Sequence, residues 1–478
     1  MGILKKLAGQ TAYYGLSSML GRLLNFLLVP LYTNEITPPS RMGIVAFLYA
    51  LAALFNVFLS YGMETAFFRY SSDGKYGKKT VASTAFTSLF ISTTLFMVLG
   101  LLFYRQAAEA VGYADMSLCV LYFVLITAFD AYAIVPFAQL RLENKAVRYA
   151  VIRLVGIALN IALNLLLILV LPRMGVIELR VENIFLSNVL SSALVMLILW
   201  VQARGIRLKA DFSLWKKMIR YGWPILIAGT AGVINETMDR VFFKILFPED
   251  IAENILGIYG NCFKMAIFIT LFIQAFRFAA EPFFFSQAKD RNAPATYARV
   301  SLYFTIVVAV MYVGIMANLS WLSAKFLGPE YRSGIDIVPI VLFANIFLGL
   351  YYNLSMWYKL TDRTRWGAYI SIMGAIVTLA VIFYGVPRYG YIAAAWSHLI
   401  TYGSMMLVSY MLGQKYYPIP YDIPKILAYL LLGWAGGYIS WYILDGNVIA
   451  GNAIFAVFCL AVLALERKSL MQFLNLKK

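Results

Sequence analysis

The 478-residue sequence is poor in charged residues and almost without histidine and cysteine. Only 13% of its residues are charged, whereas 62% are hydrophobic, and the mean hydropathy is +0.76. A soluble domain is about one quarter charged, so this composition excludes a soluble or a disordered protein. The sequence has three cysteines, no CxxC pair and a single histidine, His398. It therefore offers few ligands for a disulfide, zinc or heme site. We therefore expect neither a metal nor a cofactor.

Long apolar runs are what the sequence has instead. A membrane-spanning helix needs about 20 mostly apolar residues. The first apolar run lacks the small-residue cleavage site of a signal peptide, so we expect it to stay in the mature protein. The pattern predicts an all-α integral membrane protein with about 14 transmembrane helices. These are expected at residues 9–32, 42–68, 80–104, 117–142, 147–171, 183–203, 218–246, 254–286, 297–320, 334–358, 366–386, 389–413, 423–443 and 448–465.

The basic residues are unevenly shared between the connections. The net charge is +17, from 40 lysines and arginines against 23 acids. If the N-terminus is cytoplasmic, 26 basic residues fall on that side of the membrane and seven on the other. Cytoplasmic loops carry such an excess, so we expect both termini in the cytoplasm. The net charge then reflects topology, and we expect no nucleic-acid partner.

Two segments of the sequence resemble each other. Gly43-Ile44-Val45 opens the second run, which closes with Glu64-Thr65-Ala66-Phe67-Phe68. Gly257-Ile258-Tyr259 opens a similar segment, which closes with Glu281-Pro282-Phe283-Phe284-Phe285. The copies lie six spans apart, so both enter from the same side, as in parallel transporter repeats. We predict two six-helix bundles in pseudo-twofold parallel repeat, at 1–204 and 218–413, joined by a cytoplasmic linker at 205–217. Residues 414–478 would add two transmembrane helices and a basic tail, with Glu64 and Glu281 as gate or repeat-related residues.

Charged side chains also occur inside the apolar runs, where each costs roughly 2.5–3.5 kcal/mol at the bilayer centre. They should face one another or a hydrated cavity, and their basic surplus favours an anionic ligand such as a phosphate, which arginine binds well. Other roles are open for these residues. Charged side chains near span ends could snorkel to the membrane surface, and Glu236–Arg240 and Arg277–Glu281 could pair within one helix. Asparagines within the spans could join helices by hydrogen bonds. We predict a cationic cavity of Arg22, Arg153, Arg240, Lys264 and Arg277, supported by Ser18, Asn25, Asn160, Asn164 and Asn235, with Asp130, Glu236 and Asp239 for ion or proton coupling.

The sequence resembles bacterial polysaccharide transport flippases of the multidrug/oligosaccharidyl-lipid/polysaccharide exporter superfamily. The resemblance rests on Leu31-Tyr32-Thr33, Met42-Gly43-Ile44, Tyr61-Gly62-Met63-Glu64 with Arg69, and the segment from Asp239-Arg240-Val241 to Glu281-Pro282. It implies a flippase that moves undecaprenyl-diphosphate-linked repeat units of O-antigen, capsule or similar glycans across the bacterial inner membrane. We expect it to work by alternating access as a monomer, with a glycan polymerase and a chain-length regulator as partners. The cycle would be reset either by antiport of Na⁺ or H⁺ or by the membrane potential, and the sequence does not choose between them.

Two other functions stay open. A multidrug exporter of the same superfamily would share the helical core but would prefer an acidic cavity for cationic drugs. A membrane enzyme such as a glycan polymerase or ligase would need a sizeable outer loop with catalytic groups, and the outer connections here are short. We therefore expect no enzyme.

Overall fold

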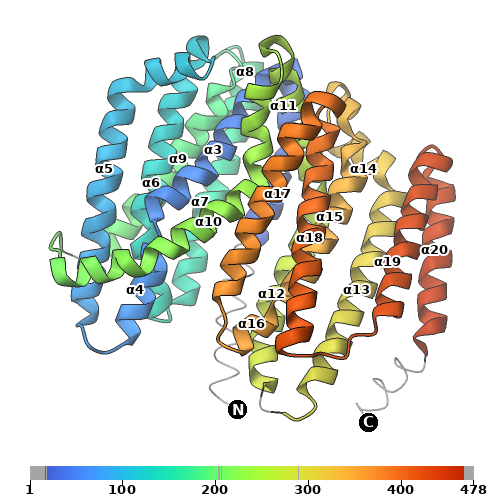
Figure 1. The fold of residues 1–478 in the computed structure, drawn as a ribbon. Coiled ribbons are helices and arrows are strands. Elements are labelled where there is room, and N and C mark those ends of the chain that lie inside the picture. The colour runs from blue at the N-terminus through green and yellow to red at the C-terminus, as the bar shows by residue number, and fades with distance from the viewer. Residues whose placement is uncertain are drawn as a thin grey trace. The chain divides into compact units, whose positions relative to one another are not determined.

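In the computed structural model, every regular element among the described residues is a helix, which confirms the all-α prediction. The structure describes residues 15, 17, 19–202, 205, 207–288 and 290–467. Contacts divide the chain into two compact units, one of residues 1–261 with 367–394 and one of residues 262–366 with 395–478 (Figure 1). The predicted bundle boundaries at 204, 217 and 413 stay a prediction.

The first unit combines the N-terminal elements with three helices from later in the chain. Its elements are α2 (Val29–Glu35), η1 (Pro39–Met42), α3 (Gly43–Ser60), α4 (Met63–Ser72), α5 (Lys78–Ala110), η2 (Ala114–Met116), α6 (Ser117–Leu142), α7 (Ala146–Asn164), the π-helix η3 (Leu165–Val170), α8 (Leu171–Arg173), α9 (Glu182–Gln202), α10 (Phe212–Leu246), α11 (Glu249–Phe263) and α17 (Arg365–Tyr389).

The second unit holds the remaining helices. They are η4 (Lys264–Ala266), α12 (Ile267–Gln287), α13 (Ala293–Ala317), α14 (Leu319–Phe326), η5 (Pro329–Gly334), α15 (Ile337–Leu354), α16 (Met356–Leu360), α18 (Ile392–Tyr416), α19 (Ile423–Tyr438), the π-helix η6 (Ile439–Ile443) and α20 (Val448–Leu465).

Eleven helical segments of the described part are long and apolar enough to cross a membrane. Three expected spans are not among them. The first, 9–32, begins outside the described residues, while 218–246 and 389–413 correspond to α10 and α18. The protein is thus a multi-pass membrane protein, and the count of 14 stays a prediction. The expected span 218–246 lies within the single helix α10, whereas the expected span 254–286 is broken by the 3₁₀ turn η4.

The break between α3 and α4 has a clear backbone cause. Tyr61 and Gly62 adopt left-handed conformations, with φ of 31° and 73°, which end α3. Gly62 also lies against the backbone of Gly222 on α10, and a β-carbon at Gly62 would come within 2.6 Å of the Gly222 carbonyl oxygen. Only glycine meets both demands at this position.

The repeated glycines make a reciprocal contact within the first unit. A β-carbon on Gly43 would clash with the backbone of Glu253, and one on Gly257 would clash with the backbone of Pro39. Gly257 follows Gly43 by 214 residues, and Glu253 follows Pro39 by the same interval. Gly260 and Ala46, also 214 apart, contact each other. A twofold axis between the copies would produce this reciprocity, although the layout of two six-helix bundles stays a prediction.

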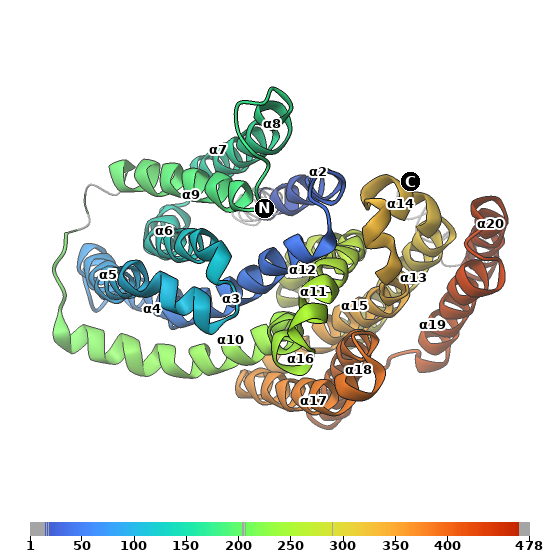
Figure 2. The same cartoon turned by 90° about the horizontal axis from the view of Figure 1, so that it is seen from above.

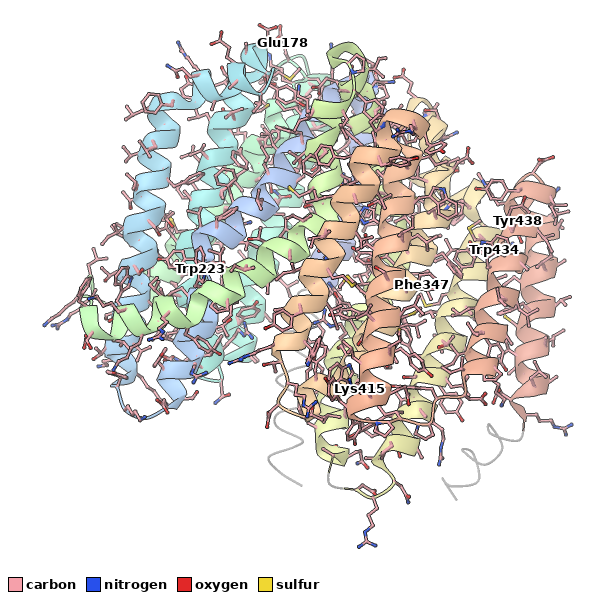
Figure 3. The ribbon with its side chains drawn as sticks, in the orientation of Figure 1. Glu178, Trp223, Phe347, Lys415, Trp434 and Tyr438 are labelled. Carbon is pink, nitrogen blue, oxygen red and sulfur yellow. The ribbon has the colours of Figure 1, made fainter. Side chains whose placement is uncertain are left out.

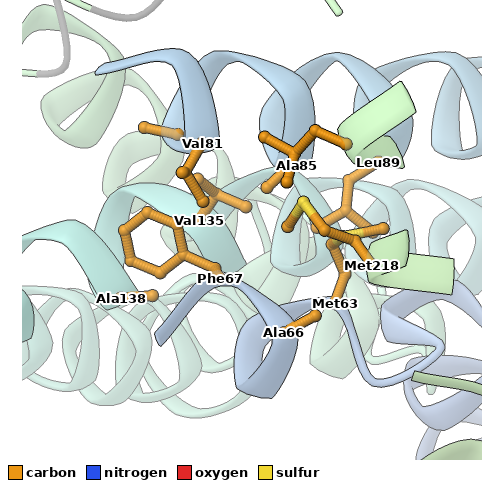
Figure 4. Close-up of a cluster of buried hydrophobic side chains, with 11 residues drawn as sticks. Met63, Ala66, Phe67, Val81, Ala85, Leu89, Val135, Ala138 and Met218 are labelled. Carbon is orange, nitrogen blue, oxygen red and sulfur yellow. The ribbon is translucent and has the colours of Figure 1, made fainter. Parts of the chain in front are cut away.

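Apolar side chains pack between helices and also cover the outside of the protein. Met63, Phe67, Val81, Leu89 and Met218 form one buried cluster where α4, α5 and α10 meet (Figure 4). Outward-facing residues of α19 and α20 are also apolar, and on α19 the Trp434 ring stacks on that of Tyr438 (Figure 3). Exposed apolar helix faces of this kind suit a hydrocarbon solvent.

Candidate functional site

A polar cavity of about 530 Å³ lies in the first unit, lined mainly by α6, α7 and α9. α7 packs closely against α9 next to the cavity: a β-carbon on Gly156 would come within 2.5 Å of the Val195 side chain. Polar and charged side chains dominate the lining: Asn25, Asn56, Glu64, Asp130, Arg141, Tyr149, Arg153, Asn160, Asn188, Ser191 and Ser192.

The two arginines of this cavity are held differently. Arg141, in the last turn of α6, forms an ion pair of 2.7 Å with Glu64 on α4. The Arg153 guanidinium lies over the rings of Phe137 and Tyr149, at 4.7 and 5.7 Å from their centroids. Among the described residues, Arg153 has no hydrogen-bond or ion-pair partner, so its five N–H donors are available to a ligand.

The carboxylates of the lining balance the two arginines in formal charge. Asp130, in the middle of α6, accepts a hydrogen bond of 2.9 Å from the Ser192 hydroxyl on α9. Glu64 is occupied by Arg141. Asp130 therefore lies in the same cavity as Arg153 without pairing directly with it.

Asparagines connect α7 to its neighbours beside the cavity. The Asn164 amide donates to the Asn160 carbonyl and accepts from the Tyr32 hydroxyl at 2.9 Å. Asn160 donates to Asn188 at 2.9 Å, and Asn188 in turn donates to the Tyr49 hydroxyl. Both Asn160 and Asn164 are buried. Asn164 thus joins helices, whereas Asn160 does so and also lines the cavity.

A second polar cluster lies on α10. Asp239 is only 1% exposed. Its carboxylate accepts a hydrogen bond of 2.6 Å from the Tyr259 hydroxyl and forms an ion pair of 3.4 Å with Arg240. Asn235, one turn earlier, donates to the carbonyl of Ser371 and accepts from Thr378, both on α17. Glu236 is exposed, and its carbonyl oxygen accepts a hydrogen bond from Arg240. Asn235 and Asp239 are buried, and Arg240 compensates the charge of Asp239.

The end of α10 belongs to a third charged group. Lys244 forms an ion pair of 2.5 Å with Glu253 on α11, and Glu253 also accepts a hydrogen bond of 2.8 Å from the Tyr113 hydroxyl. Lys244 lies 3.8 Å from the centre of the Tyr113 ring. Burial, and then the Glu253 carboxylate, raise the pKa of Tyr113. Together with the Gly43 contact, these bonds hold α11 against the start of α3.

In the second unit, Arg277 and Glu281 do not pair with each other at ion-pair distance. The Arg277 guanidinium lies 3.9 Å from the centre of the Tyr352 ring, and Glu281 pairs with Lys359. The space beside them is only about 10 Å³, roughly one water molecule. Lys264 begins the η4 turn and is partly exposed.

The predicted site residues therefore fall in several places. Asn25, Asp130, Arg153, Asn160 and Glu64 meet around the cavity, and Arg22, exposed and one turn before Asn25, lies outside its lining. Asn235, Glu236, Asp239 and Arg240 lie on α10, and Lys264, Arg277 and Glu281 belong to the second unit. Ser18 lies outside the described residues.

Several lining residues escaped sequence reasoning. Arg141 resembled one more cytoplasmic loop charge, although its pairing with Glu64 brings it to the cavity. Asn188 and Ser192 lie on α9, a span without charge at depth. Their spacing of four residues, with Ser191, was the only available signal.

No group that could hold a metal ion occurs among the described residues. The three cysteines are free, with Cys119 and Cys262 buried. His398 is buried against the rings of Phe263 and Tyr402, at 5.1 and 5.8 Å. The site works through arginine, carboxylate, amide and hydroxyl groups.

Residues 7–287 match the family model described as "Polysaccharide biosynthesis protein". A protein of Haemophilus influenzae (strain ATCC 51907 / DSM 11121 / KW20 / Rd), called an uncharacterized membrane protein, is 24% identical over 379 residues, which cover 78% of this chain and 88% of that protein.

Among solved structures, a lipid II flippase, MurJ, in an inward closed conformation matches with a TM-score of 0.74 at 13% identity, over 95% of this chain and 99% of that one. An inward-facing multidrug resistance MATE family transporter of the MOP superfamily matches with a TM-score of 0.67 at 13% identity, over 85% and 95%. These likenesses show the fold, and they are to a flippase and a transporter rather than to enzymes.

Proposed function

Because the chain belongs to the polysaccharide biosynthesis protein family, we propose that it is a flippase for lipid-linked oligosaccharides in the bacterial inner membrane. The cargo would be a repeat unit of O-antigen, capsule or a similar glycan on undecaprenyl diphosphate. Both termini would be cytoplasmic, and the protein would act as a monomer. A glycan polymerase and a chain-length regulator would use the delivered units on the outer side.

The observation that carries this proposal is Arg153. Its guanidinium is fixed over Phe137 and Tyr149, faces a cavity of about 530 Å³, and makes no hydrogen bond or ion pair with the described residues. A guanidinium fork binds phosphate oxygens in bidentate fashion. A diphosphate at Arg153 would also draw Arg141 away from Glu64, which would give the anion a second positive partner.

The rest of the lining suits a carbohydrate. Asn25, Asn160 and Asn188 offer amide donors and acceptors, and Ser191 and Ser192 offer hydroxyls. Such groups replace the hydrogen bonds that sugar hydroxyls make with water. The glycan and diphosphate would occupy the cavity while the polyprenyl chain stays in lipid. The protein would then alternate between a cavity open to the cytoplasm and one open to the outside.

The cycle needs a step that resets the empty protein. Asp239 is one candidate for coupling to Na⁺ or H⁺, because neutralising a carboxylate only 1% exposed would release its ion pair with Arg240. Asp130 and Glu236 are the other candidates. The membrane potential could also drive the return of the empty protein, with about 2.3 kcal/mol per net charge moved per 100 mV. Arg22, Lys264 and Arg277 would contribute positive charge along the path, and Arg240 would do so once Asp239 is neutralised.

Substitution of Arg153 tests the proposal. R153Q removes the charge and keeps much of the side-chain volume, and it should lower glycan export at least about tenfold, since a hydrogen bond to a charged group contributes about 1.5–3 kcal/mol. Surface polysaccharide and the accumulated lipid-linked precursor are measured in cells, together with the amount of protein in the membrane. R105Q, at an exposed arginine of α5, is the matched control and should export normally. Normal export by R153Q would refute the proposed site.

A specific observation favours one alternative. Asp130 faces the cavity with Ser192 as its hydrogen-bond partner and no basic side chain within ion-pair distance in the described chain. A carboxylate so placed would suit the cation of a drug, as in a multidrug exporter coupled to Na⁺ or H⁺. That function predicts increased drug resistance on expression, lost in D130N, with surface glycan unchanged by deletion of the gene.

A further inference from the structure

An apolar groove of about 700 Å³ runs along the face of α7 that points away from the polar cavity. α7 and α9 lie side by side (Figure 2), and both contribute to the two hollows. Tyr149, Arg153 and Asn160 line the cavity, whereas Val147, Val151 and Val155 line the groove. The two hollows share no lining residue.

The groove has an apolar floor and a basic end. Val147, Val151 and Val155 follow one another at intervals of four residues, which gives a stripe about 12 Å long, and Ile198 of α9 joins them. All three valines are more than 40% exposed, so none of the described residues covers the stripe. It is long enough for part of an acyl chain.

The basic end lies at the start of α7. Lys145 pairs with Glu143 at 2.5 Å, so that lysine is largely neutralised. Arg148 lines the same end, is exposed, and has no hydrogen-bond or ion-pair partner among the residues described here. One uncompensated positive charge therefore stands beside the apolar stripe. The charge asymmetry of the sequence predicts that this end faces the cytoplasm.

We propose that the groove is a binding site for one anionic phospholipid. The lipid phosphate would bind Arg148, with Lys145 as a second donor, and one acyl chain would lie along Val147, Val151 and Val155. A hollow between helices with a basic end matches a single anionic headgroup above an apolar chain, and basic segments next to the membrane attract anionic lipids of the cytoplasmic leaflet.

The bound lipid would have a structural consequence for the cavity. α7 would then be held by lipid on one face while Arg153 on its other face meets the ligand. The lipid would favour one position of α7 relative to α9 without touching the cargo. This site is separate from the proposed transport function, and each can fail without the other.

Native mass spectrometry of the full-length protein tests the site. The purified protein is offered an equimolar mixture of phosphatidylglycerol, phosphatidylethanolamine and a polyprenyl phosphate. We expect the wild type to retain one phosphatidylglycerol, and R148Q to lower the retained ratio of phosphatidylglycerol to phosphatidylethanolamine about fivefold, the effect of one basic side chain near an anionic surface. R299Q, at an exposed arginine of α13, is the matched control and should keep the wild-type ratio.

A second variant tests the apolar part. V151W fills the groove and should abolish retention of both phospholipids, with elution on size exclusion as the check of folding. The proposal is overturned if R148Q retains the same lipid ratio as R299Q, or if the polyprenyl phosphate displaces phosphatidylglycerol from the wild type. Because retention is read directly from the protein, its outcome does not depend on glycan export.

Discussion

A comparable ion pair occurs in each unit, in different surroundings. Glu64 at the start of α4 pairs with Arg141 at the end of α6, and Glu281 on α12, its predicted repeat counterpart, pairs with Lys359 at the end of the α15–α16 segment. The first pair borders a cavity of about 530 Å³ and the second a space of about 10 Å³. The first unit thus has an open polar hollow beside its pair, whereas the space beside the second pair is almost filled.

Aromatic side chains lie beside an arginine in both units. In the second unit, Phe276, Phe284 and Tyr352 line the small space beside Arg277, whose guanidinium lies on the Tyr352 ring. In the first unit, Arg153 lies over Phe137 and Tyr149, and asparagines and serines line much of the rest of the cavity. The space beside Arg153 is large enough for a ligand, and the space of about 10 Å³ beside Arg277 is not.

Water access to the two hollows is the sharpest test of this comparison, and we expect its contrast to be the largest. With Cys119, Cys262 and Cys459 replaced by serine, S192C should react with a membrane-impermeant thiol reagent and N353C should not, because Asn353 is 4% exposed beside the closed space. Labelling is read by mass spectrometry. Equal labelling of the two cysteines would show that the second hollow opens as well.

The two arginines should also differ in export. R153Q should lower export at least about tenfold, as argued above, whereas R277Q should lower it by a smaller factor, because the space beside Arg277 is only about 10 Å³ and does not admit the cargo. Surface glycan per unit of inserted protein is the measurement. A larger loss in R277Q would move the cargo site to the second unit.

Double-mutant cycles compare the two ion pairs themselves. E64Q with R141Q, and E281Q with K359Q, should each give a coupling of about 0.2–1 kcal/mol in thermal unfolding, since all four side chains are partly exposed. Similar couplings would fit a repeated structural role. A coupling near zero for only one pair would break the equivalence.

The smallest expected effect on stability concerns the exposed Glu143–Lys145 ion pair, which serves as a reference for the two pairs above. A hydrogen bond from Lys145 lowers the pKa of the Glu143 carboxyl. A lowered folded-state pKa contributes stability above the unfolded pKa and loses it as the pH falls through the folded value. E143Q should therefore remove about 0.5 kcal/mol or less at neutral pH, and the difference from wild type should vanish at a pH below the lowered folded-state pKa. A persistent difference at that pH would point to packing instead.

Sequence reasoning located the membrane-spanning segments well because the hydrocarbon core imposes long apolar helices. It also identified Arg153, Asp130 and Asn160, since a charge or amide in an apolar run needs a polar environment. It did not find Arg141, whose position at a helix end looks the same whether it faces water or a cavity. Nor could helical spacing on α10 reveal that Asp239 pairs with Tyr259, because that contact joins two helices.

The meeting of Ala46 and Gly260 limits how the two repeats can diverge. A β-carbon on Gly260 would come within 2.9 Å of the Ala46 methyl group, so the junction has room for a single methyl between two equivalent positions. Identical halves would carry either two methyls, which collide, or none, which leaves a gap.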